Sequence, residues 1–472
     1  MKPTTETELR TLFEAQHRAS RAAPEVGHAV RRDRLLRLRA LLERHGSALA
    51  DAVQADFGVR SPAMTEVADL FVLRTMLSHA LRHLRRWMRP QRVRTPLYLL
   101  PARGFVQRQP LGAVGVIAPW NYPLQLSLGP AIVALAAGNR VLLKPSELTP
   151  RTSEALAGAV GDAFAADEFA VVPGDSALSA AFARLPFDHL FFTGSTAVGR
   201  KVAEAAAANL TPTTLELGGK SPCIVDASCE LDQAALRIAH GKLLNAGQTC
   251  IAPDYVLLPR GRERAFGAAF ARAVAQLFPR IGGNPDYASI VSERHHGRLQ
   301  QLLADAEARG ARIERIDPAP GVTGQRQMAP TLVWGAEPTM QLLAEEIFGP
   351  VLPVLTYDTL DEAIAFVNAR PRPLALYWFG RDTAARDAVL ARTVSGGVTV
   401  NDTLLHIAHE NLPFGGVGDS GWGAYHGEAG FLRFSQQKAV LVQSRWAAGW
   451  LFYPPYGRRL AVVLSLLRRL GA

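Results

Sequence analysis

Residues 111–144 read LGAVGVIAPWNYPLQLSLGPAIVALAAGNRVLLK, and this stretch decides the fold class. The apolar run at 111–118 is typical of a buried strand, while the run at 124–137 is long enough for a helix. A second short apolar run follows at 140–143. Strand, helix and strand in this order form a unit in which the two strands lie parallel. The stretch therefore predicts an α/β fold with doubly wound parallel sheets.

The strand–helix alternation extends along most of the chain and divides it into two domains. Residues 7–88 carry apolar side chains at helical spacing and are expected to be helices. The first strand–helix series ends at Gly218-Gly219, and a second series runs on to Val400. We predict two doubly wound parallel-sheet domains, a small bridging or oligomerisation element and a tail. Their boundaries are 1–96 with 107–218, then 219–397, then 97–106 with 398–444, and finally 445–472.

The composition fits a globular protein in a reducing compartment. Of its 472 residues, 48% are hydrophobic and 20% are charged. Three cysteines are too few for a disulfide framework but leave room for one reactive thiol. The N-terminus, MKPTTETELR, lacks the apolar core of a secretory signal, and no apolar run reaches the roughly 18 residues of a spanning helix. We expect a cytoplasmic protein, at most peripheral to the inner face of the membrane.

The net charge of +10 comes largely from two arginine-rich stretches without acids, 82–94 and 445–472. No motif of a nucleic-acid-binding module accompanies them, so no nucleic-acid partner is expected. Solvated faces explain the charge equally well. In the tail, aromatic residues precede leucines and valines at helical spacing. This pattern suits either a subunit interface or weak contact with an anionic membrane surface.

Cys250 is the candidate nucleophile. It lies in LLNAGQTCIAP (243–253), after small and polar residues at the end of a helix pattern. Structural cysteines usually lie in apolar runs, as Cys223 does in SPCIVD. Reactive cysteines need a specific polar environment, so a structural thiol remains the alternative for this segment taken alone.

Two further segments supply the groups that a thiol nucleophile needs. Asn121, in APWNYP (118–123), follows a strand at the sheet edge where ligands bind, and its amide can donate to an oxyanion. Glu216, in LELGGK (215–220), stands between two leucines, where its pKa is raised or it pairs with Lys220. A thiolate, an amide donor and a general base together provide the chemistry of aldehyde oxidation through a thioester.

The first domain also carries signals of a nucleotide site. FFTGSTAVG (191–199) follows a strand and opens a helix, so a pyrophosphate could approach the helix N-terminus. Only Gly194 and Gly199 are present, which makes the pattern weak by itself. LLKPSE (142–147) adds a cation and an acid suited to ribose hydroxyl groups.

Seven motifs in order resemble the aldehyde dehydrogenase superfamily over essentially the whole chain. They are APWNYP, KPSE, FTGSTAVG, LELGGKSP, NAGQTCIAP, EEIFGPVLPV and PFGGVGDSG, and they span residues 118–421. Each is moderately specific, but seven with compatible spacing form a strong signature. The resemblance implies that the first domain binds NAD(P) and that the second is catalytic.

The resemblance also implies residue roles. Cys250 would form a thiohemiacetal and then a thioester, Glu216 would be the general base, and Asn121 would hold the oxyanion with the Cys250 backbone N–H. The implied cofactor contacts are Trp120 together with Lys144 and Glu147 at the adenosine ribose, Gly194, Ser195 and Gly199 at the pyrophosphate, and Glu346 and Phe348 at the nicotinamide riboside. The implied cofactor is NAD, with NADP possible, and no metal is expected. The implied partners are a small-molecule aldehyde and a second subunit in a homodimer.

Within the superfamily, GQTCIAPDYV (247–256) and YHGE (425–428) are similar to a class 3-like branch that acts on aromatic and longer aliphatic aldehydes. NDTLLH (401–406) and HENLPF (409–414) are most similar to bacterial coniferyl aldehyde dehydrogenases. The implied substrate is an aromatic aldehyde such as coniferyl aldehyde. The alternative is a medium- or long-chain fatty aldehyde, oxidised by a peripherally membrane-associated enzyme.

Three patterns imitate other sites. GDSG (418–421) resembles a serine-protease nucleophile segment, but the strand–helix alternation favours a glycine-rich turn. His406 and His409 could share a metal only with further ligands, and none accompanies them. Cys223 and Cys229 match no metal-ligand spacing and are expected to be structural.

Overall fold

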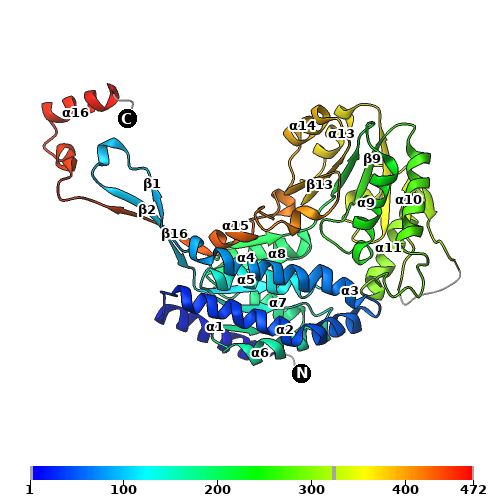
Figure 1. Ribbon diagram of the computed structural model, residues 1–472, viewed down its shortest axis with the longest axis horizontal. Coiled ribbons are helices and arrows are strands. Elements are labelled where there is room, and N and C mark those ends of the chain that lie inside the picture. The colour runs from blue at the N-terminus through cyan, green and yellow to red at the C-terminus, as the bar shows by residue number, and fades with distance from the viewer. Residues whose placement is uncertain (1–3, 321–325, 470–472) are drawn as a thin grey trace.

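The computed structural model describes residues 4–320 and 326–469. Figure 1 shows two α/β domains side by side and an arm that carries the C-terminus away from both. Each large domain is built on a mostly parallel sheet with helices packed against it. The predicted α/β fold class is therefore confirmed.

The first sheet contains the stretch that decides the fold, since residues 111–144 form a strand, a helix and a parallel strand. Across the sheet the strands are β15 (Gly421–Trp422), β7 (Thr213–Glu216), β6 (His189–Thr193), β3 (Ala113–Ile117), β4 (Arg140–Lys144) and β5 (Phe169–Val171). All pairs are parallel except β15 with β7. The helices are α1 (Glu6–Ala22), α2 (His28–Phe57), α3 (Pro62–Thr65), the π-helical turn η1 (Glu66–Leu70), α4 (Phe71–Trp87), α5 (Gln125–Ala136), α6 (Pro150–Ala163), α7 (Ser176–Ala183) and α8 (Thr196–Ala207).

The position of strand β3 in the sheet explains why its sequence is almost wholly apolar. Successive side chains of a strand point to opposite faces. Ala113 and Ile117 belong to the apolar core on the face contacted by α1 and α7. Val114 and Val116 belong to the larger core, which includes helix α5. Because both faces are covered, all five residues of β3 are buried.

The second domain repeats this architecture. Across its sheet the strands are β10 (Arg312–Arg315), β11 (Thr331–Trp334), β12 (Val351–Tyr357), β9 (Tyr255–Pro259), β8 (Pro222–Val225), β13 (Ala375–Phe379) and β14 (Gly397–Val400). Only the edge pair β10–β11 is antiparallel. The helices are α9 (Leu231–Leu243), the turn η3 (Leu244–Gly247), α10 (Glu263–Leu277), α11 (Glu293–Ala308), α12 (Gln341–Ala344), α13 (Leu360–Asn368) and α14 (Thr383–Arg392). The sequence pattern does not predict the antiparallel β10–β11 pair.

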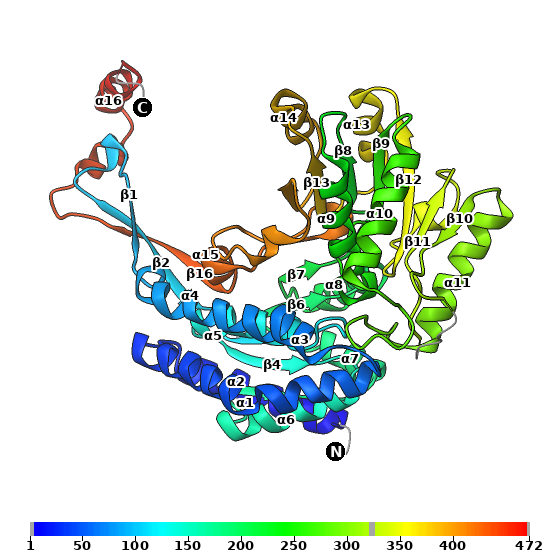
Figure 2. The same ribbon diagram turned by 45° about the vertical axis from the view of Figure 1, so that its right-hand side comes forward.

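The arm joins segments that are more than 300 residues apart. Its strands are β1 (Gln91–Val93), β2 (Arg103–Pro110) and β16 (Ser435–Val442), and its helical elements are η2 (Leu97–Leu99), η6 (Ala448–Phe452) and α16 (Arg458–Arg469). Strand β16 pairs with β2 antiparallel over eight positions. Figure 2 shows this sheet and α16 projecting beyond the domains. Of the helices in the described residues, none is long and apolar enough to cross a membrane.

The remaining elements connect the arm to the domains. They are the turns η4 (Leu405–Ala408) and η5 (Gly418–Ser420) and helix α15 (Gly427–Arg433). The chain that carries them runs from the end of the second sheet back to the first, where β15 pairs with β7. This return places Gly421 and Trp422 at the edge of the first sheet, beside Glu216 and Leu215 of β7.

Candidate active site

The loop that carries Cys250 begins where helix α9 ends. Its backbone turns through Asn245 and Ala246, both with φ of 52°, and through Gly247 with φ of 78°. This left-handed region is unfavourable for residues that carry a Cβ, so the turn needs support from its neighbours. A Cβ at Gly247 would lie 2.3 Å from the carbonyl oxygen of Gly349. The small residues before Cys250 therefore allow the backbone to form a tight, strained turn.

Hydrogen bonds tie this loop to the segment after β3. Asn245 Nδ2 donates to the Asn121 carbonyl at 2.9 Å, and Asn121 Nδ2 donates to the Gln248 carbonyl at 3.1 Å. The guanidinium of Arg60 also donates to the Asn121 carbonyl, at 2.5 Å. Arg60 is fully buried and forms an ion pair with Asp69 at 2.6 Å. These contacts make the nucleophile loop and the Asn121 segment one connected unit.

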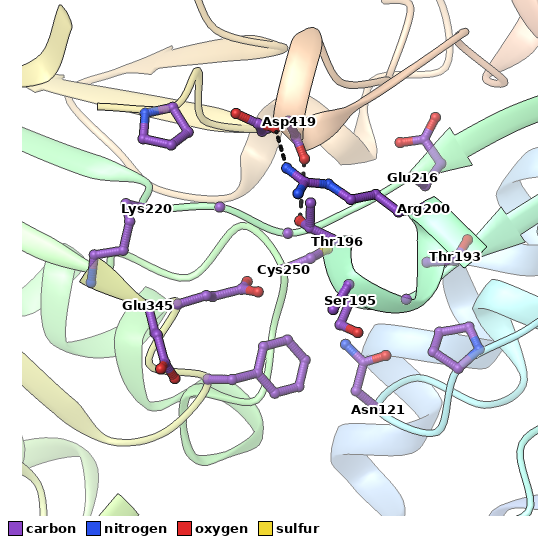
Figure 3. Close-up of a pocket in the computed structure, with 18 of the residues that line it drawn as sticks. Asn121, Thr193, Ser195, Thr196, Arg200, Glu216, Lys220, Cys250, Glu345 and Asp419 are labelled. Atoms are coloured by element: carbon purple, nitrogen blue, oxygen red, sulfur yellow. Dashed lines mark hydrogen bonds and ion pairs between the residues drawn. The ribbon is translucent and has the colours of Figure 1, made fainter. Parts of the chain in front are cut away.

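The two segments border a cleft of about 560 Å³ at the carboxyl edge of the first sheet. Figure 3 shows side chains from both domains converging on it. The predicted site residues that line this cleft are Cys250, Glu216, Asn121, Trp120, Gly194, Ser195, Glu346 and Phe348. They come from the ends of β3, β6 and β7, from the loop after α9 and from the segment before β12. The structure thus brings the nucleophile, base and amide candidates together.

Glu216 ends strand β7 and is 3% exposed. Within residues 4–320 and 326–469, neither of its carboxylate oxygens has a hydrogen-bond partner. Burial raises its pKa well above the ordinary value, and the nearby Arg433 opposes this only in part. The alternative pairing with Lys220 does not occur, because Lys220 forms its ion pair with Asp254. Glu216 is therefore a carboxyl group with a raised affinity for a proton, as a general base in an apolar site requires.

Cys250 is the one cysteine among the three that lines the cleft. Burial raises the pKa of its thiol to about 12, and the negative charges of Glu346 and Glu216 add to this. The backbone N–H groups of Cys250 and Ile251 act in the opposite direction. The thiol is thus protonated at rest, and it needs a base to become a thiolate nucleophile.

Glu346 and Phe348 line the cleft from the segment before β12. The Glu346 carboxylate packs so closely on Gly218 that a Cβ there would lie 2.0 Å from Oε2. Burial raises the pKa of Glu346 to about 8, with a further contribution from Asp254. The Phe348 ring contacts Trp120 edge to face, with 5.4 Å between the ring centroids. A carboxylate and an aromatic wall therefore border the approach to Cys250.

The first turn of α8 fits the phosphate part of a dinucleotide. Gly194, Ser195 and Thr196 line the cleft there. Ser195 caps the helix by accepting a hydrogen bond from the N–H of Val198 at 3.4 Å. A helix N-terminus offers N–H groups and partial positive charge to an anion. With Glu346 available for ribose hydroxyl groups, the cleft suits a nicotinamide dinucleotide.

Three predicted cofactor residues, Lys144, Glu147 and Gly199, are not among the described residues that line the cleft. Lys144 ends β4, and its ammonium donates to the Pro145 carbonyl at 2.7 Å and lies 4.0 Å from Glu147. Burial lowers the pKa of Lys144 to about 8. Gly199 lets α8 pack on the first sheet, because a Cβ there would lie 2.6 Å from Leu217. Cofactor contacts by these three residues stay a prediction.

One feature of the cleft escaped the sequence analysis. Asp419 lies at the cleft and forms an ion pair with Arg200 at 3.0 Å, and its carbonyl accepts a hydrogen bond from Thr196 at 3.2 Å. The segment GDSG thus bridges to the start of α8. Its Ser420 is buried, with the hydroxyl donating to the Val417 carbonyl at 3.0 Å. No local pattern predicts the contacts of Asp419 with Arg200 and Thr196, because these partners lie more than 200 residues away.

Comparisons with known proteins point to one family. The sequence profile described as "Aldehyde dehydrogenase family" matches residues 1–440. The chain is 48% identical to a "Probable coniferyl aldehyde dehydrogenase" of Pseudomonas aeruginosa, over 96% of this chain and 94% of that protein. It is 47% identical to a "Coniferyl aldehyde dehydrogenase" of Pseudomonas sp. strain HR199, over 97% and 96%. The structure titled "Substrate bound state of Staphylococcus Aureus AldH" superposes with a TM-score of 0.91 at 36% identity, over 97% of this chain and 99% of that one.

Proposed function

The chain belongs to the aldehyde dehydrogenase family, and from this premise we propose that its substrate is an aromatic aldehyde of the coniferyl aldehyde type. The family activity is the NAD(P)-dependent oxidation of an aldehyde to the carboxylic acid. The observation that carries the proposal at this site is the convergence of Cys250, Glu216 and Asn121 on one cleft. The names of two relatives at 47–48% identity support the aromatic substrate.

We propose the following roles for these residues. Glu216 takes the proton of the Cys250 thiol, and the sulfur then adds to the aldehyde carbon. The Asn121 amide and the Cys250 backbone N–H donate to the oxygen of the thiohemiacetal as it becomes negative. A nicotinamide held by Glu346, Phe348 and the start of α8 would supply the hydride acceptor, and loss of hydride from the substrate carbon would leave a thioester on Cys250. Glu216 passes this first proton to solvent and then takes a proton from water, the water oxygen attacks the thioester carbon, and the C–S bond breaks to release the acid and regenerate the thiolate.

A substrate panel tests the proposal. NADH formation is measured by absorbance with coniferyl aldehyde, benzaldehyde and a long-chain aliphatic aldehyde, each with NAD and with NADP. We expect the highest kcat/KM for coniferyl aldehyde. A preference for the aliphatic aldehyde would replace our proposal with the fatty aldehyde alternative. Absence of turnover with all three aldehydes would contradict an active dehydrogenase.

We propose that the arm packs against a second copy of the chain in a homodimer. Apolar side chains are exposed along it, namely Val93, Leu97, Tyr98, Leu100, Leu441, Val442, Trp446, Trp450, Tyr453, Tyr456, Val462, Leu464 and Leu466. A patch of this extent on a projecting sheet and helix supports a protein interface. The arginines of α16 would instead favour weak contact with an anionic membrane from the cytoplasmic side. The oligomeric state and vesicle binding of the full chain decide between the two.

A further inference from the structure

A group of buried polar side chains lies in the segment that returns from the second sheet to the first. Glu410 is 8% exposed, Tyr425 is fully buried and His426 is 1% exposed. Gln125, at the start of α5, joins them and is 4% exposed. We call these four residues the polar cluster.

The polar cluster offers hydrogen-bonding atoms that the protein does not use. Counting only partners in the described residues, the atoms without a hydrogen bond are Gln125 Nε2, Glu410 Oε1, Tyr425 Oη and both ring nitrogens of His426. Buried polar atoms nearly always form a hydrogen bond, because burying one without a partner raises the free energy of the folded protein. Four neighbouring residues with unmet atoms therefore indicate that something else completes them.

The cluster presents donors and acceptors together. Burial lowers the pKa of His426 to about 3, so its ring is neutral and has one N–H donor and one nitrogen acceptor. Burial raises the pKa of Glu410 to about 7. Gln125 lies close enough to lower the pKa of Tyr425, although in the described chain the two side chains do not meet hydrogen-bond geometry. A hydroxyl group, which both donates and accepts, would suit this set.

The polar cluster adjoins the reaction centre. The pKa of Tyr425 is raised by burial first, and the charges of Glu216, Cys250 and Glu410 raise it further. Strand β15, just before Tyr425, pairs with β7 so that Gly421 is opposite Glu216. Tyr425 therefore lies close to the catalytic pair and also to Glu410.

Aromatic rings accompany the polar atoms. Phe414 lies 5.9 Å from Tyr425 and 5.3 Å from His426 between ring centroids. On its other side Phe414 stacks on His406 at 5.8 Å, and His406 lies 6.3 Å from Tyr377. The Tyr377 hydroxyl donates to the carbonyl of Ile251, directly after Cys250, at 2.5 Å. A ladder of rings thus extends from the nucleophile loop to the polar cluster.

The direction of the reaction relates the cluster to the substrate. Hydride has to leave the substrate carbon toward the cleft, where Glu346 and the start of α8 lie. The organic substituent of the aldehyde must then extend away from that cleft. None of the four cluster residues is among the described residues that line the cleft, but the charges of Glu216 and Cys250 both act on Tyr425. The cluster is thus where a substituent pointing away from the cofactor would end.

We propose that Glu410, with Tyr425, His426 and Gln125, forms a specificity subsite that hydrogen-bonds a hydroxyl substituent on the ring of the aldehyde. This inference rests on the aromatic substrate class proposed above. The Glu410 carboxyl oxygen accepts the hydrogen bond of the hydroxyl group, and Tyr425, Gln125 or His426 donates to the hydroxyl oxygen. The rings of Phe414 and Tyr425 pack against the planar part of the substrate.

The test compares 4-hydroxycinnamaldehyde with cinnamaldehyde, which differ only in the hydroxyl group. A site that hydrogen-bonds a substrate hydroxyl discriminates strongly against the analogue that lacks it. We expect the wild-type protein to prefer 4-hydroxycinnamaldehyde by at least about tenfold in kcat/KM. Glu410→Leu should reduce this preference to within about twofold by lowering kcat/KM for the hydroxylated aldehyde alone. Glu410→Gln keeps an oxygen acceptor and should retain part of the preference.

His409→Gln is the matched control, since His409 is the exposed neighbour of Glu410. It should leave both aldehydes unchanged. If Glu410→Leu fails to fold, as judged by circular dichroism, Tyr425→Phe removes a single hydroxyl and should also reduce the preference. An equal loss for both aldehydes would overturn the subsite, because it would show a structural role.

Activity of the wild type with the two aldehydes distinguishes an error in the subsite from an error in the proposed function. A wild-type protein that oxidises both aldehydes equally well contradicts only the subsite. A wild-type protein that oxidises no aromatic aldehyde contradicts the proposed function. In that case calorimetric titration of Cys250→Ala with the two aldehydes still decides the subsite. Binding of 4-hydroxycinnamaldehyde at least about tenfold tighter supports it, and equal binding overturns it.

Discussion

The cleft and the arm depart from ordinary burial in opposite ways. Around the cleft, polar side chains such as Glu216 and Tyr425 are buried, and some of their atoms lack hydrogen bonds to the described residues. Along the arm, apolar side chains such as Trp446 and Leu466 are exposed. Each arrangement is unfavourable for the isolated chain. We therefore propose that another molecule completes each region, a ligand at the cleft and a second copy of the chain at the arm.

This difference in burial also separates the region expected to carry the chemistry, the cleft, from the region expected to carry assembly, the arm. The cleft lies at the ends of buried strands, whose packing holds side chains rigidly. The arm lies outside both cores, and its helix α16 has no buried residue. Changes at the cleft should therefore alter the rate steeply, while changes at the arm should alter assembly and leave the chemistry intact.

Cys250→Ser should give the largest effect. A serine hydroxyl is a far weaker nucleophile than a thiolate, so we expect kcat to fall by at least about a thousandfold. Folding and cofactor binding should stay nearly normal, which circular dichroism and quenching of protein fluorescence by NADH would check. Near-normal turnover of this variant would refute Cys250 as the nucleophile.

Glu216→Gln should slow the hydrolysis of the thioester, by about a hundredfold to ten-thousandfold. If the thiol can still react, a rapid burst of NADH equal to the enzyme concentration precedes a slow steady state. Stopped-flow absorbance measures both phases. Loss of the burst as well would show that Glu216 also activates the thiol, as our scheme proposes. An unchanged steady state would remove Glu216 from the mechanism.

The pH dependence sharpens this point. Because burial raises the pKa of Glu216, the folded protein holds this proton more tightly than the unfolded chain does. The resulting stabilisation is full below the unfolded pKa and is lost as pH rises toward the folded pKa. The Glu216→Gln variant has no titrating group at this position and loses no stability in this way. The Tm of the variant should therefore rise relative to the Tm of the wild type as pH increases from 5 to 9. A difference in Tm that is constant over this range would contradict the raised pKa.

The cleft and the arm also differ in how far the sequence predicts them. Cys250, Glu216 and Asn121 stand in short motifs whose local pattern implies both a strand end and a chemical role, and the structure places all three at the cleft. The ion pair of Arg60 with Asp69 that supports Asn121 has no such pattern. Lys220 illustrates the limit, since sequence proximity suggested Glu216 as its partner and the fold supplies Asp254.

The sequence predicts a bridging element and a tail but not the strand pairing within the arm, for a topological reason. Strands β2 and β16 pair although they are more than 300 residues apart, and neither shows the clean alternation of a half-buried strand. The β10–β11 pair was missed for a similar reason, because only β11 is buried throughout. Long-range pairing leaves little local signal, whereas the helical spacing of 460–467 did correspond to α16.

A smaller effect is expected for cofactor choice. We predict that NAD is preferred over NADP by about tenfold in kcat/KM, because the Glu147 carboxylate would repel a 2′-phosphate. The ammonium of Lys144, 4.0 Å from Glu147, softens this repulsion, so NADP should still be used. Glu147→Gln should narrow the preference, and Glu154→Gln in helix α6 serves as a control. Equal or better efficiency of the wild type with NADP would contradict the preference.

The smallest effect on catalysis is expected from removing the tail. A chain that ends at Ser444 loses η6 and α16 but keeps β16 and every residue that lines the cleft. We therefore expect kcat to stay within about twofold, since no catalytic contact is removed. The proposed dimer should weaken, because Trp446, Trp450 and the apolar side chains of α16, which are exposed in the single chain, could no longer pack against the second copy. Analytical ultracentrifugation of both chains measures this change.

Vesicle sedimentation distinguishes the other partner for the same tail. Five arginines and no acid lie between Arg445 and Ala472, which suits an anionic surface. If the shortened chain remains dimeric but no longer sediments with anionic vesicles, the tail is a membrane contact and our interface is wrong. If it becomes monomeric while the full chain never sediments, the arm is a subunit interface. Single amphipathic anchors bind membranes only weakly, whereas a dimer doubles every contact that its two-fold symmetry repeats, and for this reason we expect the second result.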